Sequence, residues 1–89
     1  MSNNNALIRD VSAAVLAMAR HADEAEEATH RITLNRRAEA RGHVPAGTYD
    51  RENEALRCQR DTAREGYRKA LARYARARET LAANPLPGD

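Results

Sequence analysis

The stretch Leu56–Leu81, LRCQRDTAREGYRKALARYARARETL, decides the fold of this chain. Its apolar and small side chains recur every seven residues in two interleaved rows. The first row is Leu56, Ala63, Ala70 and Ala77, and the second is Arg60, Tyr67, Tyr74 and Leu81. Rows with this spacing lie side by side on a helix and form a stripe that another helix can cover. The stretch therefore predicts a long helix that packs against a second one.

A matching pattern occupies the N-terminal half of the chain. Its apolar positions alternate three and four residues apart, at Ile8, Val11, Val15, Met18, Ala22, Ala25, Thr29 and Ile32. The Gly and Pro residues of 42–47 separate the two patterns, and this segment cannot be helical throughout. We therefore expect two helices joined by a turn.

Residues that cap helices predict where each element begins and ends. Gly42 can adopt the left-handed conformation that closes a helix, and Thr48 or Asp50 can cap the next one. The expected single domain is a frayed N-terminus 1–5, helix one 6–41, a turn 42–49, helix two 50–83 and a C-terminal tail 84–89. A connection this short makes the helices antiparallel.

The position of the turn also predicts which residues face each other. If the turn centres near Pro45 and Ala46, facing residue numbers add up to about 91, which places Gly66 opposite Ala25. Glu26 is expected to form an interhelical ion pair with Arg64. The expected interface between the helices consists of Ile8, Val11, Val15, Met18, Ala25, Ile32, Leu56, Ala63, Gly66, Tyr67, Ala70, Tyr74, Ala77 and Leu81.

Composition supports an all-α, coiled-coil-like hairpin. The chain has nineteen alanines, three tyrosines and neither Trp nor Phe, so helix is strongly favoured over strand. At 89 residues, with alanine in many core positions, a single hairpin buries little apolar area. Self-association relieves this shortage, and we expect a homodimer that forms a four-helix bundle.

No set of residues predicts catalysis, a cofactor or a metal ion. Glu26 and His30 supply two possible metal ligands without a third at matching spacing. Cys58 has no histidine near it in the expected hairpin to act as a base. We therefore expect no catalytic, cofactor-binding or metal-binding residues, and no enzyme activity.

The sequence predicts a cytoplasmic protein without a membrane span. The apolar run 6–19 is interrupted by Arg9 and Asp10 and is too short to cross a bilayer of about 30 Å. The run has no basic leader before it. A single cysteine, Cys58, fits a reducing compartment.

Nucleic-acid binding is the alternative function that the charges suggest. The net charge is only +2, and fourteen of the fifteen basic residues are Arg. A local basic patch on helix two comprises Arg68, Lys69, Arg73 and Arg76. Binding by phosphate neutralisation needs a stripe of one sign, whereas the outward face of this helix is mixed. Nucleic acid is therefore the less favoured partner.

Several apolar residues fall outside the expected interface and suggest a second contact surface. They are Leu16, Ala19, Leu71 and Ala75, with Leu34 as a possible extension. An apolar strip beside a satisfied interface is typical of a surface on which another helix packs. We expect this strip to form either the dimer interface or the partner interface.

These features favour a protein–protein interaction module over an enzyme. Small helical hairpins of this size are common among phage and prophage accessory proteins that bind and inhibit a host factor. A transcription regulator, a pilus motor or a defence complex is such a factor. This is an analogy between classes of protein, and it predicts a host or cellular protein as the partner.

Overall fold

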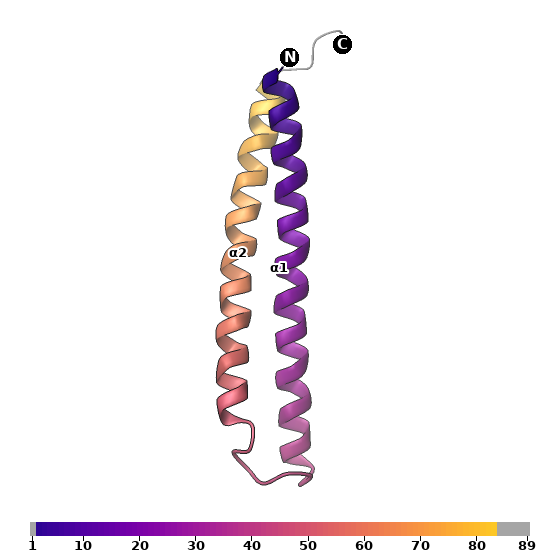
Figure 1. Ribbon diagram of the computed structural model, residues 1–89, viewed down its shortest axis with the longest axis vertical. Helices are drawn as coiled ribbons and strands as arrows, with labels where there is room; N and C mark the ends of the chain where they lie inside the picture. The colour runs from indigo at the N-terminus through magenta and orange to yellow at the C-terminus, as the bar shows by residue number, and fades with distance from the viewer. Residues whose placement is uncertain (1, 84–89) are drawn as a thin grey trace.

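The computed structural model describes residues 2–83, which form two long antiparallel helices joined by one loop (Figure 1). Helix α1 spans Ser2–Ala40 and helix α2 spans Asp50–Ala83. The described residues contain no strand. α2 occupies the expected range, but α1 begins at Ser2, so the expected frayed start is helical from that residue onward. Met1 and the expected tail 84–89 lie outside the described residues.

α1 ends in a glycine-dependent cap. Gly42 has a φ of 74°, a left-handed conformation that costs glycine little. Its N–H donates to the Glu39 carbonyl, and the His43 N–H donates to the Ala38 carbonyl, both at 3.0 Å. This pair of bonds satisfies carbonyls that the end of a helix would otherwise leave unpaired.

α2 is capped by the last turn of α1. The Asn53 N–H donates to the Tyr49 carbonyl at 2.8 Å, which makes Tyr49 the N-cap residue in place of the expected Thr48 or Asp50. The Tyr49 N–H in turn donates to the Glu39 carboxylate at 3.1 Å. A carboxylate at this position also interacts favourably with the positive end of the α2 dipole. The start of α2 is thus fixed to the end of α1.

Two buried asparagines show how the helices are aligned. Asn35 Nδ2 donates to Asn53 Oδ1 at 2.9 Å, and the two residues are only 5% and 6% exposed. Their residue numbers add to 88, and those of the contacting pair His21 and Gly66 add to 87. The predicted register of about 91 was therefore wrong by about one helical turn. At that register Asn35 would face Leu56, and a buried amide would lose its partner.

The face that α1 turns toward α2 also differs from the prediction. Ile8 and Val15 are each 44% exposed, although both were expected in the interface. The row that faces α2 instead consists of Leu7, Ala14, His21, Ala28 and Asn35, which are buried or half-buried. Val11, Met18, Ala25 and Ile32 belong to the neighbouring row, which is buried or half-buried as expected.

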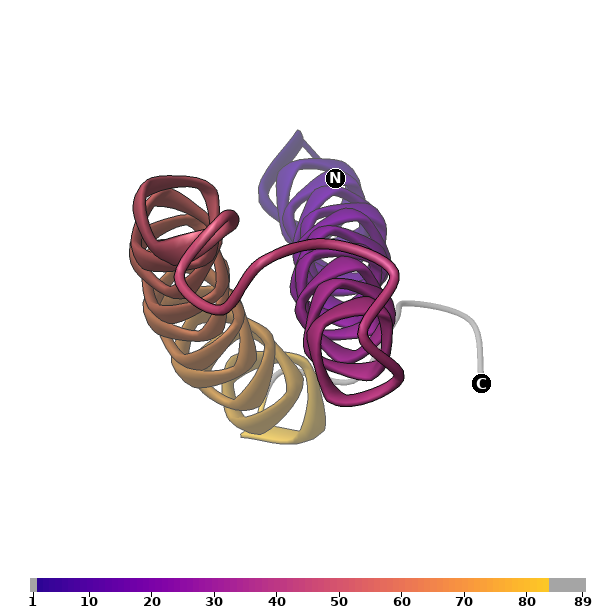
Figure 2. The ribbon, with the colours of Figure 1, turned by 90° about the horizontal axis from the view of Figure 1, so that it is seen from below.

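α2 contributes mainly alanine to the core. Ala63, Ala70 and Ala77 are buried, with Leu56, Gly66, Tyr74 and Leu81 half-buried beside them. Tyr67, which was expected in the interface, is 37% exposed. Among the described residues no large side chain is fully buried. The helices wind around each other in a left-handed sense (Figure 2), as a seven-residue repeat requires.

We predict that Asn35→Leu lowers the free energy of unfolding by about 1–3 kcal/mol, because it leaves the Asn53 amide buried without a partner. The double variant Asn35→Leu/Asn53→Leu should recover most of this loss, since it removes both polar groups. Urea unfolding measures both changes. A double variant no more stable than the single one would show that pairing of these amides is not what the core requires.

We also predict that cysteines at Ala25 and Ala63 form a disulfide in a Cys58→Ser background, because the register of 88 places these residues at the same level. A disulfide requires Cα atoms within about 7 Å of each other. Cysteines at Ala22 and Ala70 should not crosslink. Ala22 is exposed, and it lies about one turn along α1 from Met18, which the register of 88 places at the level of Ala70. Electrophoresis without reducing agent separates the crosslinked and open forms.

Candidate functional site

The two lateral flanks of the hairpin differ in chemistry. A helix turns by about 100° per residue, so residues two apart point to opposite flanks. This separates Ile8 from Asp10 on α1 and Leu71 from Arg73 on α2. Asp10 and Arg73 lie on what we call the charged flank, and Ile8 and Leu71 lie on what we call the apolar flank.

Two ion pairs between the helices occupy the charged flank. Arg73 Nη2 lies 2.6 Å from Asp10 Oδ1, and Arg31 Nε lies 3.1 Å from Glu52 Oε1. These side chains are about half exposed, so each pair stabilises the hairpin by roughly 0–1 kcal/mol. Their larger effect is that these four charged groups already have partners within the hairpin.

The apolar flank has no such pairs. We define it by Ile8, Val15 and Ala22 of α1 and by Tyr67 and Leu71 of α2. Leu71 is 44% exposed, as are Ile8 and Val15. A groove of roughly 490 Å³ opens along this flank at the middle of the hairpin. It is lined by His21, Ala22, Ala25, Arg64, Tyr67, Arg68 and Leu71.

The inner wall of this groove is formed by His21, which packs on Gly66. A Cβ atom placed at Gly66 would lie only 2.7 Å from the His21 ring. Gly66 is therefore covered by an imidazole and does not oppose Ala25 as expected. His21 Nδ1 is buried without a hydrogen-bond partner, and the nearest carboxylate oxygen of Glu24 is 3.9 Å away.

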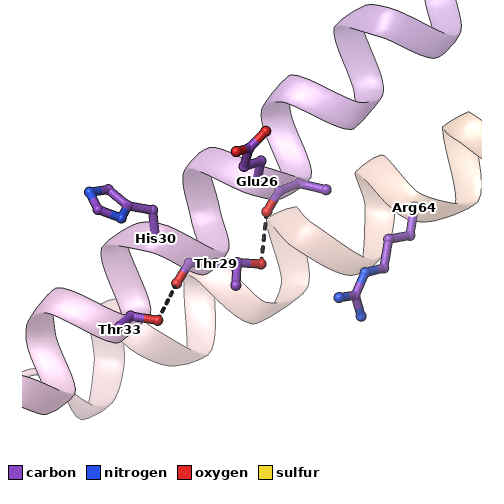
Figure 3. Close-up of a pocket in the computed structure, with 6 residues that line it drawn as sticks. Glu26, Thr29, His30, Thr33 and Arg64 are labelled. Atoms are coloured by element: carbon purple, nitrogen blue, oxygen red, sulfur yellow. Dashed lines mark hydrogen bonds between the residues drawn. The ribbon is translucent and has the colours of Figure 1, made fainter.

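Toward the loop the same flank becomes polar (Figure 3). A shallow pocket there is lined by Ala25, Glu26, Thr29, His30, Thr33 and Arg64. The Thr29 and Thr33 hydroxyls donate to the carbonyls four residues earlier, at 2.9 and 3.0 Å. Glu26 and Arg64 project away from each other, and the ion pairs of the described residues do not include the expected one between them. The groove at Leu71 is thus the apolar part of this flank.

The residues expected to form a second contact surface are divided by the structure. Ala19, Leu71 and Ala75 are exposed, and Leu16 is the most exposed large apolar residue at 71%. Leu16 follows Val15 by about 100° and points straight outward, so Val15 rather than Leu16 lies on the apolar flank. Leu34 was wrongly grouped with this strip, since it lines a pocket with Arg31 and Glu52 on the charged flank.

The basic residues considered for nucleic-acid binding do not share one face. Arg73 is paired with Asp10 between the helices, and Arg68 Nη1 lies 2.9 Å from Glu65 Oε2. Lys69 and Arg76 are exposed on another part of α2. Two of the four charges are therefore already compensated by carboxylates.

The other candidate features are a metal site, the single cysteine and a membrane-spanning helix. Within residues 2–83 no three His, Cys, Asp or Glu side chains gather closely enough to hold a metal ion. Cys58 is exposed. In the same range, neither helix has a stretch long and apolar enough to cross a membrane.

The sequence did contain a signal for the apolar flank that the interpretation of α1 missed. α1 carries apolar residues on three adjacent rows, represented by Leu7, Val11 and Ile8. One partner helix covers only two rows. The third row therefore has to be exposed or covered by another helix.

No protein-family model matches this chain, and no curated protein or solved structure is significantly similar to it.

We predict that the effect of Gly66→Ala on stability changes sign with the residue at position 21. In the wild-type chain the new methyl group meets the His21 ring, so the free energy of unfolding should fall. In a His21→Ala background the ring is gone, and the same change should raise the free energy of unfolding by about 1 kcal/mol through helix propensity. Urea unfolding of the four proteins measures this coupling, and equal effects in both backgrounds would contradict the contact.

Proposed function

We propose that this protein is a non-enzymatic protein-binding module whose apolar flank binds a helix of a partner protein. The observation that carries the proposal is the contrast between the flanks. One is bridged by Asp10–Arg73 and Arg31–Glu52, whereas the other exposes Ile8, Val15 and Leu71. An exposed apolar strip with a groove is the surface on which an amphipathic helix binds.

The thin core supports the same proposal. The buried apolar residues within the described part of the chain are five alanines and Ile32. Alanine contributes much less than the roughly 1.5–3 kcal/mol of a buried Val or Leu side chain. A helix bound over Val15 and Leu71 would add large buried side chains that the hairpin lacks.

A second copy of the chain is the competing occupant, and it would produce the four-helix bundle expected from the sequence. Arg64 and Arg68 line the groove, and no carboxylate does. A copy packed groove to groove would therefore bring like charges together, which is unfavourable. We propose a different chain as the partner. By the class-level analogy with phage accessory proteins, it is a host protein whose activity the hairpin modulates.

We predict that Val15→Glu/Leu71→Glu abolishes partner binding and leaves the hairpin folded. Both residues are 44% exposed, and Glu is a good helix former, so helicity and the urea midpoint should change little. A carboxylate buried against a bound helix is strongly unfavourable. Binding is followed by affinity capture from a nuclease-treated bacterial lysate with mass spectrometry, and folding by circular dichroism.

The matched control is Ala13→Glu/Ala72→Glu, which adds the same charges at exposed positions away from the apolar flank. Proteins that bind the wild type and this control, but not Val15→Glu/Leu71→Glu, support the proposal. Light scattering that shows a wild-type dimer and a monomeric Val15→Glu/Leu71→Glu variant would make a second copy the occupant. In a parallel capture from a lysate without nuclease treatment, nucleic acid that binds the wild type and is lost when Lys69 and Arg76 are neutralised would favour the alternative function instead.

A further inference from the structure

We infer that the helix bound on the apolar flank is acidic, with carboxylates that pair with the arginines of α2. This inference rests on the proposed function, because it specifies the partner of the same surface. It is carried by the distribution of charge around the groove. The groove lining includes two arginines, Arg64 and Arg68, and no Asp or Glu.

The groove can hold an apolar side chain of a bound helix, and its α2 edge is positively charged. Ala22 and Ala25 of α1 are small, while Tyr67 and Leu71 of α2 are large and partly exposed. A volume of roughly 490 Å³ accommodates an apolar side chain of a bound helix. Arg64 and Arg68 are contributed by α2 alone, so carboxylates should lie on the side of the bound helix that is nearer α2.

These arginines are available for a partner. Among the described residues no carboxylate forms an ion pair with Arg64. Arg68 is paired with Glu65, but its side chain is 76% exposed, and such a pair is weak enough to be exchanged. Guanidinium groups form forked, planar hydrogen bonds with carboxylates, which suits them to recognise Asp or Glu.

Among the described residues, no carboxylate of α1 forms an ion pair with Arg64 or Arg68. Asp10 is paired with Arg73 on the charged flank. The Glu24 carboxylate lies 3.7 Å from Arg20 Nε and 3.9 Å from His21 Nδ1, and Glu26, which lines the neighbouring pocket with Arg64, forms no ion pair with that arginine. Within residues 2–83, Arg64 therefore has no paired opposite charge, and Arg68 has only its exposed pair with Glu65, so a partner helix can supply carboxylates to both.

A third arginine extends the same edge toward the open end of the hairpin. Arg78 lies over the Tyr74 ring at 5.7 Å and donates to the Tyr74 hydroxyl at 2.8 Å. Arg64, Leu71 and Arg78 are seven residues apart, so they point the same way and span roughly 21 Å at 1.5 Å per residue. The matching partner helix has an apolar residue in the middle and acidic residues about seven positions on either side.

The test uses two synthetic helical peptides of about 21 residues that share the same leucine face. One carries Glu and the other carries Lys at the positions beside that face. Fluorescence anisotropy measures their affinity for the hairpin at low and high salt. We expect the Glu peptide to bind at least about tenfold more tightly than the Lys peptide at low salt. This preference should shrink as salt screens the charges.

Charge reversal provides the decisive comparison. Arg64→Glu/Arg68→Glu should reverse the preference, so that the Lys peptide binds more tightly than the Glu peptide. The control Lys69→Glu/Arg76→Glu makes the same change in net charge at exposed positions away from the groove. This control should retain the preference for the Glu peptide, although net charge alone would predict otherwise.

The possible failures are distinguishable. Equal binding of both peptides that is abolished by Val15→Glu/Leu71→Glu would overturn the acidic partner and leave the apolar docking surface intact. A preference that changes equally in both charge-reversed variants would overturn the role of Arg64 and Arg68. Binding of neither peptide to the folded wild-type hairpin would overturn this inference and the proposed docking surface together.

Discussion

A single hydrogen bond between two buried amides determines how the helices of this protein face each other. Asn35 and Asn53 are 5% and 6% exposed and bond to one another at 2.9 Å. A slip of one turn would place both amides against apolar side chains. An unpaired buried amide costs about 1–3 kcal/mol, which is a large fraction of the stability of a small domain. The pair therefore favours the observed register over the one predicted from the apolar pattern.

This register has a direct consequence for the surface. It turns the row of Leu7, Ala14, His21, Ala28 and Asn35 toward α2 and leaves the row of Ile8 and Val15 outside. The polar residues His21 and Asn35 are thus accommodated inside the hairpin, by Gly66 and Asn53 respectively. Larger β-branched side chains remain exposed on the flank. The hairpin gives up apolar burial within itself and leaves that apolar surface exposed on the flank.

The sequence was sufficient to predict the hairpin, the range of α2 and the turn, because helical periodicity and the Gly and Pro cluster are local signals. It was insufficient for the register, since two overlapping patterns fit α1 equally in spacing. Both include Val11, Met18, Ala25 and Ile32, and they differ in whether Ile8 and Val15 or Leu7 and Ala14 join them. The first pattern includes one polar residue, Thr29, whereas the second includes His21 and Asn35, so hydrophobicity favours the first pattern, which was wrong. Polar residues at corresponding positions in both helices, Asn35 and Asn53, carried the information that was missed.

The same misassignment explains why the apolar flank could be located only in part. Leu71 and Ala75 were recognised from α2, whose interface rows were largely correct, whereas Val15 was assigned to the core and Leu34 to the wrong flank. Once the register is known, the flank follows from geometry, since Ile8 and Asp10 must lie on opposite sides of α1. Anything that binds the folded hairpin and not the unfolded chain also stabilises it. The core of the described residues consists of five alanines and one isoleucine, so the side chains exposed on this flank are larger than most of those in the core. A helix that covered the row of Ile8 and Val15 would therefore also stabilise the hairpin, because that row lies next to the two rows of α1 that α2 covers.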